Sequence, residues 1–355
     1  MAKVELLDNQ EEIGKIDKSG MLRLVGRLPE MISEAERLSA YVSLPAAKRF
    51  NQVLVLGMGG SAIAGDIAAD LFLKKANAPI ITSRNYLIPE YVSPETLVFA
   101  LSYSGNTEET LSAAREADKA GARIICVGSG GKLKEFAEAK RHPFYLIPGG
   151  CQPRAALPYL FVPLVISLEK LKIVPPVEAD LKETAGLLLK LRDEYGPARP
   201  ARVNPVKQLA KKLSGRLPVI FGSSGTTGAA ALRFKTQLNE NSKITALLNV
   251  FPELNHNEIV NLGALKRESH NFSLIVFRDE DESERIKKRI EITKSLLVRQ
   301  LGGVNEVVSQ GKSFLARLFS LIFLGDHLSV YLAILKDTDP TPVEAIARLK
   351  KELLR

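Results

Sequence analysis

Short apolar runs alternate with helix-length segments along most of this chain, and this alternation constrains the fold more than any other feature. The runs are rich in Ile, Val and Leu, and segments such as 61–74 and 107–120 between them are long enough for helices. Buried strands separated by helices are typical of a parallel sheet that is covered on both faces. The first series of runs occupies residues 53–57, 79–82, 97–101, 123–127 and 143–147.

The same pattern restarts in the second half of the chain. Residues 217–222 form an apolar run that is followed by a Gly/Ser turn and a predicted helix at 229–238. Val53-Leu-Val-Leu-Gly-Met-Gly-Gly-Ser61 and Val219-Ile-Phe-Gly-Ser-Ser-Gly225 resemble each other, and each opens an α/β series. We expect further strands at 244–250, 272–277 and 304–308, and helices at 282–301, 314–335 and 341–353.

The length of 355 residues suits about two domains. We predict a helical segment over 1–50, a first α/β unit over 51–195 and a second over 196–355. Long helices at 155–172 and 177–195 close the first unit, and the stretch 196–205, with three prolines, is the expected linker. Each unit should have three α/β/α layers around a mainly parallel sheet.

The charge balance gives little support to a nucleic-acid partner. There are 49 basic and 40 acidic residues, a net charge of +9, but the basic residues are spread among acids. Aromatic residues are 6% of the chain and Trp is absent, whereas single-strand binders interleave aromatics with concentrated charge. A mildly positive field suits a small anionic substrate.

The chain also carries no pattern of a membrane or secreted protein. The apolar runs 155–168 and 314–335 are interrupted by Pro, Arg, Asp or His, and the first twelve residues hold four acids, unlike a signal peptide. Cys126 and Cys151 are too few for a disulfide framework and wrongly spaced for zinc. We therefore expect a cytoplasmic protein without structural metal.

A glycine-rich loop, Gly57-Met-Gly-Gly-Ser-Ala-Ile-Ala-Gly65, follows the first strand and opens a helix. Glycines allow a close backbone approach to an anion, and the helix N-terminus offers free N–H groups. A dinucleotide site would need an acidic residue after the second strand, but Ile80-Ile-Thr-Ser-Arg-Asn85 stands there. We predict phosphate binding by Gly59, Gly60 and Ser61; the alternative is a merely tight turn.

A second polar loop, Ser102-Tyr-Ser-Gly-Asn-Thr-Glu-Glu-Thr110, follows the strand at 97–101. Three hydroxyls, a glycine and a helix start can surround a phosphate monoester that binds without reacting. We predict that Ser102, Ser104 and Thr107 contact the phosphate. The alternative is ordinary helix capping by Thr107 or Ser104 with acids in the first turn, and both can hold together.

These two loops resemble the first half of a sugar isomerase (SIS) domain. Further segments narrow the resemblance to the bifunctional phosphoglucose/phosphomannose isomerases of archaea and bacteria. The match runs from about Val53 to Ile346, and the combination is more specific than any single motif. The additional segments are Pro153-Arg-Ala-Ala-Leu-Pro-Tyr159, Asn239-Glu-Asn-Ser-Lys243, Glu253-Leu-Asn-His-Asn-Glu258 and Asp339-Pro-Thr-Pro-Val343.

The resemblance implies interconversion of an aldose and a ketose phosphate through ring opening and a cis-enediolate. By position in the motifs, Glu240 is the base that moves the proton between C1 and C2, flanked by two asparagines that could orient it. His256 is the ring opener, and Arg154 stabilises the enediolate. Considered alone, Glu240 reads as a solvated side chain; the alternative for Arg154 is a surface-loop arginine, which the apolar segment after it disfavours. Thr341 either assists near the ring oxygen or caps a helix that has Pro342 at its first position.

The remaining ionisable candidates receive no catalytic role. His142, His270 and His327 lack a polar cluster like the one around His256; His142 reads as a loop residue and His327 as a core or interface residue. Glu253 and Glu258 are left without a certain role. The four histidines show no metal-ligand spacing, and proton transfer requires neither metal nor nicotinamide. In the wider family the histidine comes from a neighbouring subunit, which implies a homodimer.

Three functions remain in competition, two of them enzymatic and one not. The first is interconversion of both glucose 6-phosphate and mannose 6-phosphate with fructose 6-phosphate, since the two aldoses give the same enediolate. The second is another SIS-type sugar-phosphate isomerase or deaminase. The third is a non-catalytic sugar-phosphate sensor, for which residues 1–50 lack a basic recognition helix.

Overall fold

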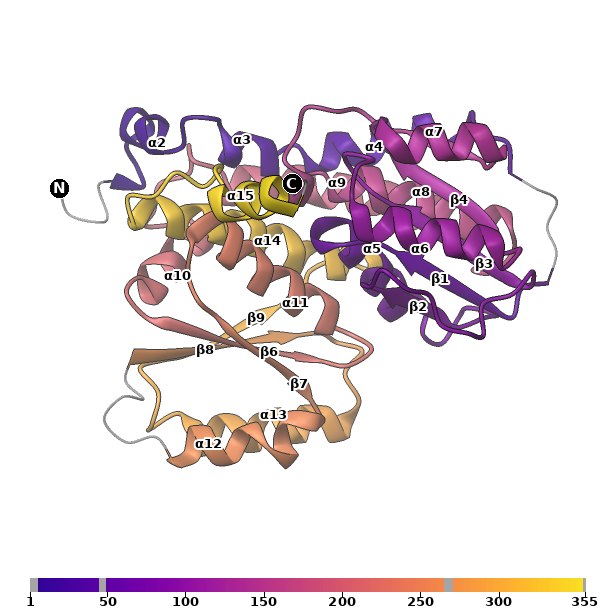
Figure 1. The fold of residues 1–355 in the computed structure, drawn as a ribbon. Coiled ribbons are helices and arrows are strands. Elements are labelled where there is room, and N and C mark those ends of the chain that lie inside the picture. The colour runs from indigo at the N-terminus through magenta and orange to yellow at the C-terminus, as the bar shows by residue number, and fades with distance from the viewer. Residues whose placement is uncertain (1–5, 45–48, 265–270, 354–355) are drawn as a thin grey trace.

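Five parallel strands form the first sheet, in the order β2-β1-β3-β4-β5. The computed structural model, drawn in Figure 1, describes residues 6–44, 49–264 and 271–353. All six residues of β3 are buried, because helices cover this sheet on both faces. The strands are β1 (Gln52–Leu56), β2 (Ile80–Ser83), β3 (Thr96–Leu101), β4 (Arg123–Gly128) and β5 (Phe144–Leu146).

Alternating side chains of these strands enter two different cores. Val53 and Val55 pack in the cluster that contains α5 (Gly59–Phe72) and α8 (Leu157–Lys170). Leu54 and Leu56 pack in the cluster that contains α6 (Glu108–Lys119) and α7 (Gly131–Lys140). This follows from the two-residue period of a strand, which sends successive side chains to opposite faces.

Four parallel strands form the second sheet, in the order β7-β6-β8-β9. Its outer face packs against α12 (Glu258–Ala264) and α13 (Glu284–Leu297), and its inner face against α11 (Gly228–Gln237) and α14 (Phe314–Leu335). Each sheet is therefore the middle layer of an α/β/α unit, as predicted. The strands are β6 (Leu217–Ser223), β7 (Leu247–Phe251), β8 (Phe272–Arg278) and β9 (Val304–Val308).

The inner faces of both sheets contribute to one continuous core. Leu97 of the first sheet and Ile275 of the second belong to the same apolar cluster, with α14 between the halves. Among the described residues, α14 is the one helix long and apolar enough to cross a membrane. However, 94% of its most apolar stretch is buried inside the protein. Burial on all sides explains why α14 is apolar all round.

The N-terminal segment is helical, as predicted, and packs on this core. It contains α2 (Gln10–Ile16), α3 (Met21–Val25) and α4 (Leu28–Ser39). Met31, Ile32 and Ala35 of α4 are buried, and α4 contacts α8 and α9 (Glu178–Tyr195). The segment covers helices of the first half, and its described buried apolar residues belong to the main core rather than to a separate one.

The remaining elements lie close to their predicted positions, with small differences at the ends. Residues 196–204 connect α9 to α10 (Pro205–Leu213), where Asn204 caps the helix and Pro205 occupies its first turn. The two sheets fall on either side of residue 196, and the domain boundaries stay a prediction.

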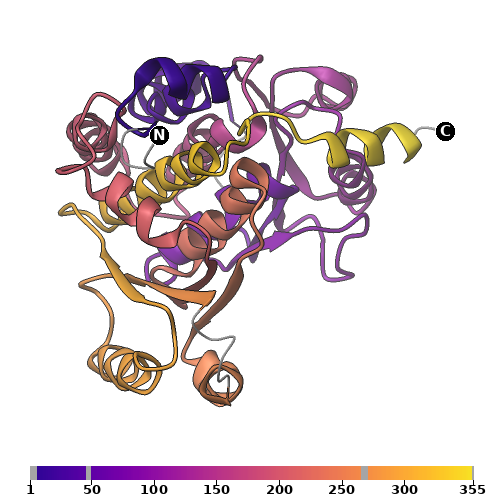
Figure 2. The same ribbon diagram turned by 90° about the vertical axis from the view of Figure 1, so that its left-hand side faces the viewer.

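The predicted helix at 341–353 begins only at Glu344 (α15, Glu344–Leu353), and α15 lies along the outside of the molecule with no buried residue (Figure 2). Short helices carry the site loops: η1 (Pro153–Ala155), η2 (Leu238–Ser242) and η3 (Glu253–His256).

Asp70 on α5 joins the two halves through the loop that echoes the first glycine-rich loop. Its carboxylate accepts a hydrogen bond of 2.9 Å from the N–H of Ala229 in the first turn of α11, and another from the N–H of Gly225. Burial raises the pKa of Asp70 from its ordinary value of 3.8 to about 6, against the opposing effect of these N–H groups.

We predict that Asp70→Asn changes the pH dependence of stability. Because the folded pKa is raised, the contribution of Asp70 is fully present below pH 3.8 and is lost as pH rises toward 6. A shift of about two units corresponds to about 2–3 kcal/mol on an order-of-magnitude scale. In urea unfolding, the stability of Asp70→Asn relative to the wild type should therefore increase by that amount between pH 4 and pH 7. A difference that is constant over this range would contradict the prediction.

Candidate active site

The glycine-rich loop between β1 and α5 lies directly against η1. A Cβ added at Gly60 would meet the carbonyl oxygen of Pro153 at 3.0 Å and the Cα of Arg154 at 3.1 Å. Gly59 has φ +49°, a left-handed conformation that favours glycine. Ser61 is buried, and its hydroxyl accepts a hydrogen bond of 3.3 Å from the N–H of Tyr103. The close approach brings the N-terminus of α5 next to Arg154.

The second loop, between β3 and α6, holds its hydroxyls in a local network. The hydroxyl of Ser102 donates to that of Thr107 at 2.9 Å and accepts from the Thr107 N–H at 3.4 Å. Thr107 occupies the N-cap position of α6, but its side chain makes no capping bond, so the expected hydroxyl cap is absent. Ser104 is exposed, and its hydroxyl accepts from the Asn106 N–H at 3.3 Å.

The two loops lie at the carboxyl edge of the first sheet, where its topology reverses. Strands β1 and β3 are neighbours, yet α5 follows β1 on one face and α6 follows β3 on the other. Such a switch point is where open parallel sheets bind ligands, and two helix N-termini meet there. The bond between Ser61 and Tyr103 connects the loops. All six predicted phosphate-binding residues thus lie in one region.

Arg154 of η1 is the most constrained charged group near these loops. Only 3% of its side chain is exposed. Its Nε donates to Oδ1 of Asn241 at 2.6 Å, and its Nη2 donates to the carbonyls of Pro340 and Thr341 at 2.8 and 2.9 Å. Burial lowers the pKa of Arg154, and the nearby charge of Glu240 opposes that effect.

Glu240 lies on η2, a π-helical turn that continues α11, and its Oε2 is 3.5 Å from Nη1 of Arg154. About a quarter (27%) of the Glu240 side chain is exposed, so the carboxylate is reachable from solvent. Neither flanking asparagine hydrogen-bonds it: Asn239 donates to the Ile244 carbonyl, and Asn241 bonds Arg154 and Ser329. The expected orientation by asparagines is therefore replaced by orientation from Arg154. π-Helical turns often occur at functional sites.

Thr341 lies in the turn between α14 and α15, three residues before α15 begins. The alternative that made it a helix cap before Pro342 is wrong, because neither residue is at the start of α15. Its N–H donates to Oδ1 of Asp339 at 2.9 Å, and its hydroxyl oxygen is buried without a hydrogen-bond partner. The structure therefore brings Arg154, Glu240 and Thr341 together.

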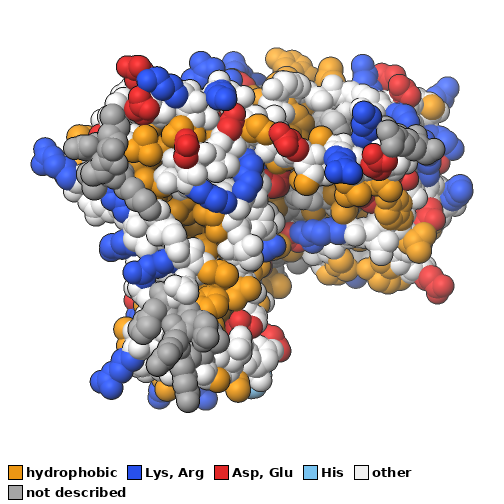
Figure 3. Space-filling view, turned by 60° about the vertical axis from the view of Figure 1, so that its left-hand side comes forward, with side chains coloured by type: hydrophobic (Ala, Val, Ile, Leu, Met, Phe, Trp, Pro, Cys, Tyr) orange, Lys and Arg blue, Asp and Glu red, His pale blue; other side chains and the backbone are white. Residues whose placement is uncertain are grey.

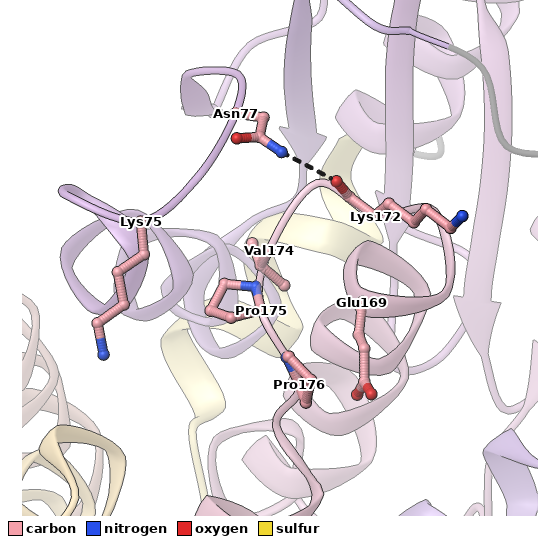
Figure 4. A pocket seen from close by; sticks show the side chains of 7 residues that line it. All are labelled: Lys75, Asn77, Glu169, Lys172, Val174, Pro175 and Pro176. Carbon is pink, nitrogen blue, oxygen red and sulfur yellow. Dashed lines mark hydrogen bonds between the residues drawn. The ribbon is translucent and has the colours of Figure 1, made fainter.

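A cavity of about 500 Å³ opens beside Glu240. Its wall combines η2, Lys243, the connecting residues Pro342 and Val343, and the start of α15 at Glu344. A second hollow of about 740 Å³ lies elsewhere, at Lys75, Asn77 and Lys172 (Figure 4). There the amide of Asn77 donates to the Lys172 carbonyl and the two ammonium groups point apart, so no polar groups converge on a ligand.

Within this chain, His256 does not join the cluster of Arg154, Glu240 and Thr341. His256 is exposed and is the last residue of η3, which follows the carboxyl end of β7. Glu240 comes before the amino end of β7 in the chain. The five residues of β7 span roughly 16 Å at the usual rise of a strand. The two predicted catalytic residues therefore lie toward opposite edges of the second sheet.

The other histidines are in different settings. His327 is buried in α14, as predicted, and burial lowers its pKa to about 4. His142 is in a loop after α7, as predicted, and its Nε2 lies 3.0 Å from Oδ1 of Asp118, which is 24 residues away in sequence. His270 lies outside the described residues. Among those residues, no group of three His, Cys, Asp or Glu side chains is placed to hold a metal ion.

A buried network behind Arg154 was missed in the sequence. Arg233 of α11 donates to both carboxylate oxygens of Asp326, at 3.0 and 2.7 Å, and to the carbonyl of Arg154 at 2.7 Å. Gln237 also donates to Asp326. Asp326 is the sole acid in the apolar run 314–335, which is the signal that could have indicated a buried partner.

Basic side chains are dispersed on the face shown in Figure 3, where Lys and Arg alternate with Asp and Glu and with apolar groups. Surface ion pairs of the protein include that of Lys294 with Glu291, at 2.8 Å. This face shows no continuous basic stripe of the kind that tracks a nucleic-acid backbone.

Comparison with known proteins gives consistent matches over most of the chain. The SIS domain matches residues 48–149, and the bacterial phospho-glucose isomerase C-terminal SIS domain matches residues 202–353. A crystal structure of a glucose-6-phosphate isomerase like protein from Thermus thermophilus has the same fold, with a TM-score of 0.64 and 19% identity over 95% of this chain and 98% of that one.

Two curated relatives share much more sequence. A bifunctional phosphoglucose/phosphomannose isomerase of Caldicellulosiruptor bescii is 46% identical over 94% of this chain and 98% of its own length. One of Thermoplasma acidophilum is 39% identical over 86% of this chain and 90% of its own length. The chain therefore belongs to the family of bifunctional phosphoglucose/phosphomannose isomerases, built on the SIS fold.

Proposed function

We propose that this enzyme interconverts glucose 6-phosphate and mannose 6-phosphate with fructose 6-phosphate. The observation that carries the proposal is the placement of Arg154: its backbone lies against the glycine-rich loop, and its buried guanidinium lies 3.5 Å from the carboxylate of Glu240. A sugar phosphate that binds its phosphate at the two loops would extend its reacting carbons toward this pair. The names of the two curated relatives support the same substrates.

The phosphate is proposed to bind at Gly59, Gly60 and Ser61 of the first loop and at Ser102, Ser104 and Thr107 of the second. Backbone N–H groups at the start of α5 and α6 favour a dianion, and hydroxyls can donate to its oxygens. These groups hold the phosphate without activating it, because none is a nucleophile placed for attack on phosphorus.

Isomerisation is proposed to proceed by proton transfers alone. His256 moves the proton from O1 to O5 as the ring opens. Glu240 then removes the proton from C2 and returns it to C1, while the hydroxyl proton passes from O2 to O1. Arg154 stabilises the negative charge of the cis-enediolate between these steps. Thr341, whose hydroxyl has no partner, is proposed to assist near the ring oxygen. These steps use no cofactor.

His256 is proposed to come from a second copy of the chain. Within one protomer it lies beyond the opposite end of β7 from Glu240 and is exposed. A two-fold dimer in which each protomer supplies His256 to the other would complete two sites at once. We place this homodimer in the cytoplasm, with neither nucleic acid nor membrane as a partner.

Both aldoses should be substrates, because they differ only at C2 and abstraction of that hydrogen erases the difference. We expect turnover of fructose 6-phosphate to both glucose 6-phosphate and mannose 6-phosphate in separate coupled assays. Formation of only one aldose would refute the dual activity. Absence of both would favour the sugar-phosphate sensor, and release of ammonia from glucosamine 6-phosphate would favour a deaminase.

Glu240→Gln should lower kcat by about 10²–10⁴-fold with little change in substrate binding, since the amide keeps the shape of the side chain but cannot accept the proton. Steady-state kinetics and calorimetric titration of fructose 6-phosphate measure the two effects. Glu284→Gln on α13 is the matched control, because that carboxylate is 88% exposed. Retained turnover in Glu240→Gln would remove this residue from its role.

Mixing two inactive variants tests the shared site. Glu240→Gln and His256→Asn should each be inactive as homodimers, but a mixed dimer contains one site with both native residues. Random reassortment of equal amounts gives about half mixed dimers, each with one active site of two, so about a quarter of wild-type activity should return. No recovery after verified subunit exchange would contradict contribution of His256 from a second copy.

A further inference from the structure

The turn between α14 and α15, residues 339–341, is held through its backbone carbonyls by two cations. Arg154 donates to the carbonyls of Pro340 and Thr341. Lys243, which follows η2, donates from Nζ to the carbonyls of Asp339 at 2.8 Å and Pro340 at 3.0 Å. The carbonyl of the buried Pro340 therefore receives hydrogen bonds from both cations.

The Lys243 ammonium is fully engaged by backbone oxygens. Its third contact is the Asn241 carbonyl at 3.2 Å, so three acceptors meet the three N–H groups that an ammonium has. These contacts tie the turn that carries Thr341 to the turn that carries Glu240. A lysine in this state has no donor left for a substrate phosphate.

The backbone at Lys243 also requires an explanation. Its φ is +51°, the left-handed region, which costs a residue with a Cβ about 1–2 kcal/mol. Glycine or asparagine is the usual residue at such a helix end. Here the left-handed conformation sends the lysine stem back toward the 339–341 turn, and the side chain lines the cavity beside Glu240.

The charges around Lys243 fit a cation that stays partly desolvated. Burial lowers its pKa, the charge of Arg154 adds to that effect, and Asp339 and Glu240 oppose it. Lys336 approaches from the end of α14 and donates to the carbonyls of Ser242 and Lys243 at 3.4 and 2.7 Å. Lys243 at the end of η2 thus donates to the turn after α14, and Lys336 at the end of α14 donates back to the end of η2.

We propose that Lys243 is a positioning residue for the isomerase reaction: it holds the 339–341 turn against η2 and so fixes Thr341 and the carbonyls that orient Arg154 relative to Glu240. The inference rests on the proposed function. Its action is indirect, through backbone carbonyls. Misplacement of reacting groups by about 1 Å can cost on the order of 100-fold in rate.

The test compares Lys243→Met with the wild type, since methionine keeps an apolar stem but removes all three donors. We expect kcat to fall about 10–100-fold, with KM for fructose 6-phosphate within about threefold, because ground-state binding uses the phosphate loops. The inhibition constant of 5-phosphoarabinonate, a stable mimic of the enediolate, should rise by a similar factor to the fall in kcat/KM.

Lys172→Met is the matched control. Lys172 also follows a helix in a left-handed conformation, with φ +58°, but its side chain lies at the hollow of Figure 4, away from Glu240. This variant should retain wild-type kcat and inhibition constant. Any loss of stability common to both variants would then be separated from the effect on catalysis.

The outcomes are distinct. Unchanged kcat and inhibition constant in Lys243→Met would overturn the proposal. A rise in KM alone would overturn it as well, since it would indicate direct contact with the substrate. A fall in kcat with an unchanged inhibition constant would show only a smaller folded fraction, again against positioning. If the wild type itself turns over neither aldose, the proposed function fails, and this inference falls with it.

Discussion

The buried guanidinium of Arg154 is the interaction on which the rest of the site depends. Removing a cation from water is costly unless its donors are satisfied and its charge is opposed. Arg154 meets the first condition through Asn241 and two carbonyls from the 339–341 turn, and its own carbonyl is held by Arg233. Its charge is opposed only partly, because the nearest carboxylate oxygen of Glu240 is 3.5 Å from Nη1 of Arg154. A cation so arranged is already oriented for negative charge that develops next to it.

The sequence predicted the layers of the fold well, because buried parallel strands leave long apolar runs and their helices fit between them. It could not predict that Arg154 and Glu240 meet, since 86 residues separate them and no local pattern encodes the contact. Only resemblance to a family suggested both residues together. The Arg233–Asp326 pair was missed for a related reason: a single acid in an apolar helix indicates a buried partner without indicating which one. Thr341 was ambiguous because its surroundings come from elements far apart in the chain.

The repeat visible in the sequence has different chemistry in its two copies. In the first copy, the glycine-rich loop faces Arg154 and its helix N-terminus lies at the switch point of the first sheet. In the second copy, the corresponding loop donates backbone N–H groups to Asp70. A carboxylate from the first half thus occupies the position at the second loop where an external anion would otherwise be attracted. The duplicated fold therefore presents the same anion-binding geometry twice, and in the second copy a carboxylate of the chain itself occupies it.

The core shared by the two sheets limits how the molecule can move. Because α14 packs on both halves at once, a hinge rotation of one half against the other would have to repack that helix on two sides, which close-packed interiors resist. The cavity beside Glu240 is lined on one side by residues 342–346, which lead into the exposed α15, so access to it depends on this surface segment rather than on closure of two lobes. The geometry of such a site stays fixed, although its substrate is less shielded from solvent. A fixed geometry suits a reaction whose reactant and product differ only in the placement of protons.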